Sequence, residues 1–236
     1  MALYQIAELC IAMDCTGDIV TRRAEKYKID CGTPVAHLAM TEAARQSLLS
    51  KNPALTDAEC ELIDVGRELS RTMLHHNGFV LHASAILYRG QAVLFSADSG
   101  VGKTTHTRLW QTVYGAGAVP ILNDDKPAVR CMDGRYIAYG TPFSGNSEEN
   151  RNESAPLRAI VLLERGASPA IRPLSAAEAL PPLLAQTLRP HSNGDEMGLL
   201  LGFLDGLLRT VPVYQLTCNM DPESAVLAHD ALFGKG

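Results

Sequence analysis

An eight-residue loop between a run of β formers and a helical pattern constrains this chain more than any other feature. The apolar run Ala92–Phe95 precedes it, and apolar residues at helical spacing follow from Lys103 to Tyr114. Strand, glycine-rich loop and helix in this order are typical of an α/β fold. The loop fits the Walker A form of a phosphate loop, and we call it the glycine-rich loop: Ala97-Asp98-Ser99-Gly100-Val101-Gly102-Lys103-Thr104.

The residue types of this loop predict binding of a nucleoside triphosphate, ATP. Gly100 and Gly102 allow consecutive backbone N–H groups to point at phosphates, and the following helix adds its positive end. Lys103 is expected to reach the β and γ phosphates, and the Thr104 hydroxyl to bind Mg²⁺, which prefers oxygen ligands. The alternative is a glycine-rich turn before a core helix. We expect the nucleotide to contact Asp98, Ser99, Gly100, Val101, Gly102, Lys103, Thr104 and Thr105.

Two adjacent carboxylates, Asp124 and Asp125, end the apolar strand pattern that begins at Ile121, twenty positions after Thr104. One helix and one strand fit this interval, so the pair should emerge beside the glycine-rich loop. Adjacent residues on a strand point to opposite sides, and we therefore expect different tasks for them. One would bind Mg²⁺ and the other would accept a substrate proton, and as metal ligands we favour Asp124 and Thr104. The alternative for the pair is a solvated turn.

A histidine precedes the loop on the outer strand of an expected hairpin. His82 lies in the β-former run Phe79–Tyr88, and a second run, Gln91–Ser96, follows the turn Arg89-Gly90. A lone strand histidine is usually structural. Because His82 precedes the glycine-rich loop and the acidic pair along the chain, it is also a candidate residue of the site.

The segment from about residue 78 to 130 resembles HPr kinase/phosphorylases and ATP-dependent phosphoenolpyruvate carboxykinases. Both families place a histidine, a hairpin, a phosphate loop and an acidic pair in this order, and His82-Ala83-Ser84-Ala85 resembles the carboxykinase segment with a metal-binding histidine. The resemblance implies an α/β fold with a mixed sheet and flanking helices. It also implies that the triphosphate and metal are surrounded by His82, Lys103, Thr104, Asp124 and Asp125.

Three functions follow as hypotheses. The first is an ATP- and Mg²⁺-dependent kinase that transfers the γ-phosphoryl group to a hydroxyl of a small molecule, peptide or protein, with Asp125 or Asp124 as base; small HPr-kinase-like proteins match this length. The second is a carboxykinase-like enzyme, and the third is a nucleotide-binding regulatory module without turnover.

The polar stretch 144–154 is a weaker candidate for the substrate side of the site. Arg151 would neutralise charge on the transferring group, and one of the glutamates among residues 148–153 would approach Mg²⁺. A solvated loop is the alternative. On the helix after the loop, His106 and Arg108 lie where the sugar or base of a nucleotide would pass.

Composition narrows the partners. The formal charge of −5 has no strong basic block to oppose it, which argues against nucleic acid and anionic membranes as partners. No secretion signal or long apolar run is apparent, and the six cysteines form no C-x-x-C pair, so we expect a cytoplasmic protein with reduced thiols. The oligomeric state stays open.

Local signals outside the site divide the chain at about residue 75. Residues 1–75 are expected to form an N-terminal α+β extension, with short strands and turns to about residue 50 and a helix after the capping box Thr56–Glu59. Residues 76–236 are expected to form the HPr-kinase-like domain. Within it, Ser175–Glu178 is a second capping box, and Asp221-Pro222 opens a last helix.

Overall fold

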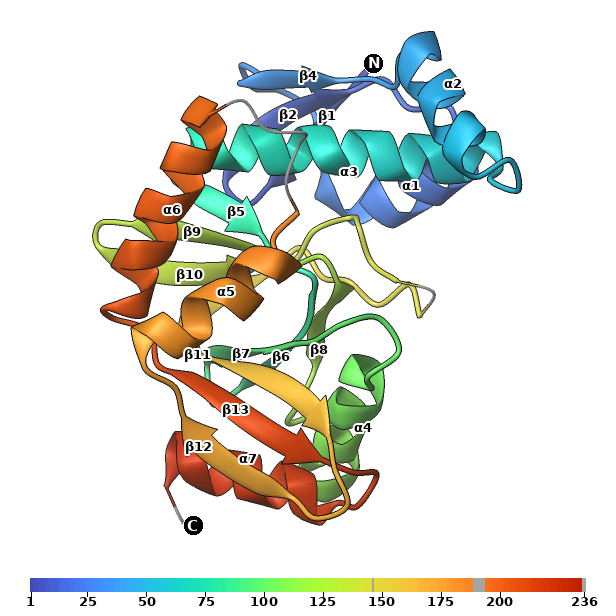
Figure 1. The fold of residues 1–236 in the computed structure, drawn as a ribbon. Helices are drawn as coiled ribbons and strands as arrows, with labels where there is room; N and C mark the ends of the chain where they lie inside the picture. The colour runs from blue at the N-terminus through green and yellow to red at the C-terminus, as the bar shows by residue number, and fades with distance from the viewer. Residues whose placement is uncertain (146, 189–193, 235–236) are drawn as a thin grey trace.

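The computed structural model describes residues 1–145, 147–188 and 194–234, and over these residues the chain is a mixed α/β protein with two β-sheets (Figure 1). The smaller sheet has the strand order β3-β1-β2-β4. Its strands are β1 (Ala2–Ile6), β2 (Leu9–Met13), β3 (Lys28–Ile29) and β4 (Ala36–Leu38).

Helices interrupt the N-terminal region where short strands and turns were expected. Residues Asp18–Ala24 form α1, Glu25–Tyr27 form the 3₁₀ helix η1, and Glu42–Lys51 form α2. The expectation of only short strands and turns up to about residue 50 was therefore wrong for these segments. A helix of seven residues is too short to show a clear apolar period, and α2 buries only Leu48.

The long helix α3 (Asp57–His75) lies between the smaller sheet and the rest of the molecule (Figure 1). Its predicted capping box is confirmed: Thr56 accepts from the backbone N–H of Glu59, whose side chain accepts from the backbone N–H of Thr56. The helix ends at His75, and Asn77, two residues later, adopts a left-handed φ of +56°. Core residues of α3 pack with residues of both sheets in one apolar cluster that includes Ile6, Leu9, Val65, Leu69, Met73, Val80, Tyr139 and Phe143.

The larger sheet has the order β5-β9-β10-β11-β7-β6-β8, with β13 also paired to β11 and β12 paired to β13. The predicted hairpin is confirmed, because β6 and β7 pair antiparallel across Arg89-Gly90. The β-former run from Phe79 is split into β5 and β6, with His82 between them. The strands are β5 (Gly78–Val80), β6 (Ala83–Tyr88), β7 (Gln91–Ser96), β8 (Ile121–Asp125), β9 (Ala128–Met132), β10 (Arg135–Tyr139), β11 (Ser154–Arg165), β12 (Ala170–Pro173) and β13 (Val213–Cys218).

Helices cover both faces of this sheet because the side chains that point to each face of its central strands are apolar. On β7, Ala92 and Leu94 join the apolar cluster that contains residues of α5 (Ala176–Gln186) and α6 (Gly194–Leu208). Val93 and Phe95 join the opposite cluster, which contains residues of α4 (Lys103–Tyr114) and α7 (Glu223–Phe233). The capping box predicted at Ser175 is present at the start of α5.

Three parallel strands place their carboxyl ends at one edge, since β11 pairs parallel with both β7 and β13. The glycine-rich loop follows β7 at this edge and leads into α4. Ligands of α/β proteins bind at such an edge. Among the described residues, no helix is both long and apolar enough to cross a membrane.

Candidate functional site

The glycine-rich loop curls around the side chain of its own lysine. Gly100 and Gly102 have φ values of +80° and +124°, which residues with a Cβ rarely adopt. Helix α4 begins directly after them, at Lys103. The Lys103 Nζ donates to the carbonyl oxygens of Ala97 at 2.9 Å and Asp98 at 3.3 Å. Burial lowers the pKa of Lys103, and the nearby carboxylates of Asp124, Asp125 and Asp98 oppose that shift.

The first carboxylate of the acidic pair lies against the hydroxyl of Thr104. β8 pairs with β6, the strand beside β7, so its last residues lie next to the loop. The Thr104 Oγ1 lies 3.0 Å from Asp124 Oδ1 and 3.2 Å from Oδ2. Asp124 is only 5% exposed and also accepts from Ser147 Oγ at 2.6 Å. The structure thus brings together the two oxygen donors that the sequence assigned to a metal.

The second carboxylate lies in different surroundings, as the alternation of strand side chains predicted. Asp125 Oδ1 lies 3.4 Å from His82 Nε2, and its Oδ2 pairs with Lys126 Nζ. The side chains of His82 and Asp125 are 27% and 21% exposed, so both remain accessible. His82 therefore faces the acidic pair and is not a buried core histidine.

One cavity of about 420 Å³ joins these groups at the carboxyl edge of the sheet. All five residues that the sequence analysis placed around a triphosphate and metal line it. Of the loop residues expected at the nucleotide, Asp98 and Val101 do not line this cavity. Its lining is His82, Ser99, Gly100, Gly102, Lys103, Thr104, Thr105, Asp124, Asp125, Gly145 and Ser147.

Arg151 does not reach this cavity, which corrects the expectation that it neutralises charge there. Its Nε donates to the carbonyl of Ile121 at 3.1 Å, and its NH1 lies 3.3 Å from Glu153. Glu148 pairs with Arg22, and Glu149 pairs with Arg108. These long side chains pair with neighbouring charged side chains or with main-chain carbonyl groups. They thereby hold the 144–154 segment against the protein surface. They line a separate cavity of about 690 Å³.

Three further contacts at the loop were missed by the sequence analysis. Ser147 reaches Asp124 from the 144–154 segment, Arg165 donates to the carbonyl oxygens of Val101, at 3.1 Å, and Gly100, and Gln186 binds both His82 and Asp98. None lies in a motif, because each comes from a segment far along the chain. The position of Arg165 is explained by the parallel pairing of β11 with β7, which places the end of β11 beside the loop.

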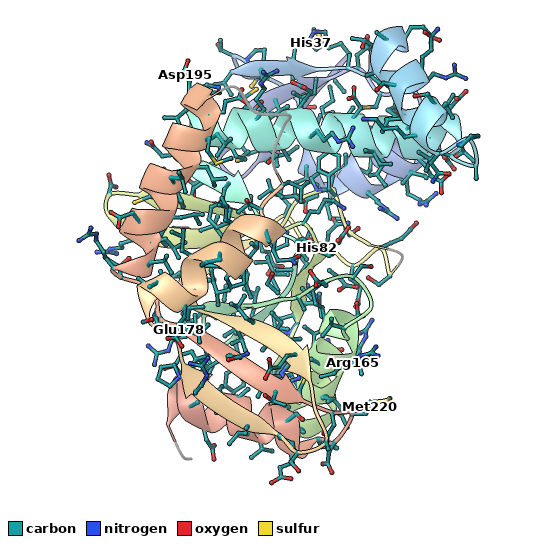
Figure 2. All side chains as sticks on the ribbon, viewed as in Figure 1. His37, His82, Arg165, Glu178, Asp195 and Met220 are labelled. Carbon is teal, nitrogen blue, oxygen red and sulfur yellow. The ribbon has the colours of Figure 1, made fainter. Side chains whose placement is uncertain are left out.

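A second cavity, of about 390 Å³, adjoins the first at Gly102 and Thr105, which line both. Figure 2 shows Arg165 and Met220 near α4, and both line this cavity, at the ends of β11 and β13. His106 also lines it, buried and accepting from Trp110 Nε1 at 3.2 Å, and burial lowers the pKa of His106 to about 3. The rest of the lining is Val101, Gly166, Cys218 and Asn219.

Within residues 1–145, 147–188 and 194–234, no three His, Cys, Asp or Glu side chains form a cluster that could hold an ion. Thr104 and Asp124 nevertheless fit Mg²⁺, which is usually held by one or two protein oxygens together with waters and substrate phosphates.

No protein-family model matches the chain, and no curated protein matches it. Among solved structures, the chain is similar to the HPr(Ser) kinase/phosphatase from Coxiella burnetii, with 11% sequence identity and a TM-score of 0.38. The match covers 64% of this chain and 95% of that chain. It is a distant similarity of fold, and it does not show that the chain belongs to that family.

Proposed function

We propose that the chain is an ATP-dependent, Mg²⁺-dependent kinase that transfers the γ-phosphoryl group to a hydroxyl. The observation that carries this proposal is the contact between Thr104 and Asp124 at the start of α4, with Asp125 and His82 across the same cavity. A nucleotide-binding module without turnover has no need of a second carboxylate and a histidine there. We also propose that the fold is HPr-kinase-like, as expected from the sequence.

Each side chain has a role that its contacts support. Lys103 leaves the carbonyls of Ala97 and Asp98 to neutralise the β and γ phosphates, and the N–H groups at the start of α4 bind phosphate oxygens. Thr104 and Asp124 would hold Mg²⁺, which would supply positive charge beside the phosphates. Asp125 orients the acceptor hydroxyl and accepts its proton.

The second cavity is where we place the base and sugar of the nucleotide. It adjoins the first at Gly102 and Thr105, so it is the next space available to a ligand whose phosphates lie over the loop. Val101, Cys218 and Met220 give it apolar surface, as expected of a site for a flat heterocycle. ATP should therefore bind more tightly than tripolyphosphate, measured by calorimetry with Mg²⁺. Equal affinities would remove the second cavity from the site.

The loop assignment is tested by Lys103→Ala. A charge-assisted hydrogen bond to phosphate contributes about 1.5–3 kcal/mol, so the affinity for MgATP should fall roughly ten- to hundredfold in calorimetry. Lys51→Ala, at the end of α2 and far from the loop, is the matched control and should bind as the wild type does. An unchanged affinity in a folded Lys103→Ala variant would show that the loop does not bind the triphosphate.

A further inference from the structure

Gln186, the last residue of α5, connects two parts of the candidate site that are far apart in sequence. Its side-chain Oε1 lies 2.9 Å from His82 Nδ1, and its Nε2 donates to Asp98 Oδ1 at 2.6 Å. Its main-chain carbonyl accepts from the backbone N–H of His82 at 2.9 Å. One residue of α5 therefore contacts both the histidine and the glycine-rich loop.

The orientation of the Gln186 amide follows from the chemistry of its partners. An ionised carboxylate only accepts hydrogen bonds, so the NH₂ group must face Asp98. The amide oxygen then faces His82, and it can only accept. His82 Nδ1 must consequently carry a proton and donate it to Gln186 Oε1.

This arrangement decides what the other ring nitrogen presents to the cavity. His82 Nε2 lies 3.4 Å from Asp125 Oδ1. Without Gln186, the favourable neutral tautomer would carry its proton on Nε2 and donate it to that carboxylate. With Nδ1 protonated, the neutral ring instead presents the Nε2 lone pair to Asp125 Oδ1, and these two acceptors repel each other until a donor in the cavity binds to both.

We propose that Gln186 is a positioning residue that holds His82 as the Nδ1–H tautomer, so that Nε2 is a hydrogen-bond acceptor at the site of transfer. The consequence for the reaction rests on the proposed function. The hydroxyl that receives the phosphoryl group then lies beside two hydrogen-bond acceptors, Asp125 Oδ1 and His82 Nε2. Together they fix the direction in which its O–H bond points. Histidines in catalytic and metal sites are commonly oriented in this way by a partner on the second nitrogen.

The tautomer is measured directly by ¹⁵N NMR of protein labelled at histidine, without nucleotide, at about pH 8. His82→Gln identifies the His82 signals among the seven histidines of the chain. The wild type should show a protonated Nδ1 and an unprotonated Nε2. In Gln186→Met, which keeps the length of the side chain and removes both polar groups, the proton should move to Nε2. The signals of the other histidines should stay in place, which shows that the variant is folded.

Gln46→Met, on the exposed surface of α2, is the matched control and should keep the wild-type tautomer. The proposal is overturned if His82 of the wild type carries its proton on Nε2 or on both nitrogens. It is also overturned if folded Gln186→Met retains the Nδ1–H form.

A second readout separates positioning from binding. In Gln186→Met the transfer rate should fall about tenfold or more, while the affinity for MgATP changes by less than about threefold, because neither Gln186 nor Asp98, the loop residue that it binds, lines the triphosphate cavity. An unchanged transfer rate would overturn the role of the tautomer in the reaction. If the wild type transfers no phosphoryl group at all, the proposed function fails, whereas the NMR result on His82 still decides the tautomer.

Discussion

At the scale of single residues, Asp124 and Asp125 are neighbours in sequence with different surroundings. Asp124 is held by two hydroxyls, while Asp125 faces His82 and Lys126. Asp125→Asn should therefore keep the affinity for MgATP and lower the transfer rate about 10²- to 10⁴-fold, because the amide cannot accept the hydroxyl proton. Calorimetry measures the first quantity, and transfer of labelled phosphate to acceptors found by screening measures the second.

Two further substitutions make this result specific. Asp124→Asn should weaken MgATP binding, since it removes charge beside Thr104. Asp133→Asn changes an exposed carboxylate in the turn between β9 and β10 and should alter neither quantity. Transfer at the wild-type rate in Asp125→Asn would remove Asp125 as the base.

The residues of the site that sequence predicted are those within or beside local motifs. Lys103 and Thr104 belong to the glycine-rich loop, and the two aspartates end the next strand of the chain. Ser147 and Gln186 were not predictable, because their roles depend on tertiary contacts. Gln186 is 104 positions from His82, and no pattern connects the two before the chain is folded.

At the scale of elements, the predicted features with local causes are present. The capping boxes at Thr56 and Ser175 each depend on residues three positions apart, and the β6–β7 hairpin depends on its turn. α1 was missed because seven residues are too few to show a clear apolar period, and α2 was missed because it buries only Leu48. Their positions are decided by packing on α3, which a local pattern does not contain.

Two glycines in different elements should respond in opposite ways to alanine. A Cβ at Gly140, after β10, would lie 1.8 Å from the carbonyl oxygen of Arg151 and 3.0 Å from that of Leu122. Main chain has to move, so Gly140→Ala should destabilise the protein by roughly 1–3 kcal/mol. Gly198 lies exposed in α6 with nothing near a Cβ, and Gly198→Ala should stabilise by about 0.5–1 kcal/mol.

Urea unfolding of the two variants measures both effects. Gly140 lies against the 144–154 segment, which bonds to the main chain of β8 at Leu122 and Asp124. Gly140→Ala should therefore also displace Asp124 and weaken MgATP binding. A fully stable Gly140→Ala variant would mean that this crossing is loose. A destabilised Gly198→Ala variant would mean that the exposed face of α6 is packed against something.

At the scale of the whole molecule, the N-terminal region is fastened to the segment that supports the acidic pair. Arg23 of α1 is 8% exposed and donates to the carbonyl oxygen of Ser144 at 2.5 Å. Ser144 in turn forms a β-bridge with Asp125. Lys26 and Tyr27 donate to the carbonyls of Asn150 and Arg151, at 2.7 and 2.9 Å. The division of the chain at residue 75 stays a prediction, but these contacts give the first part a structural role at the site.

Two adjacent arginines of α1 test this role, because only one of them is buried. Arg23→Ala leaves the Ser144 carbonyl without its donor and should destabilise the protein by about 1–3 kcal/mol. It should also lower MgATP affinity, since the segment that carries Ser147 loses its support beside Asp124. Arg22→Ala removes the exposed pairs with Glu148 and Asp18 and should leave both the stability and the affinity nearly unchanged. Thermal unfolding and calorimetry on both variants measure these differences. Equal, small effects would mean that the 144–154 segment holds the acidic pair without the N-terminal region.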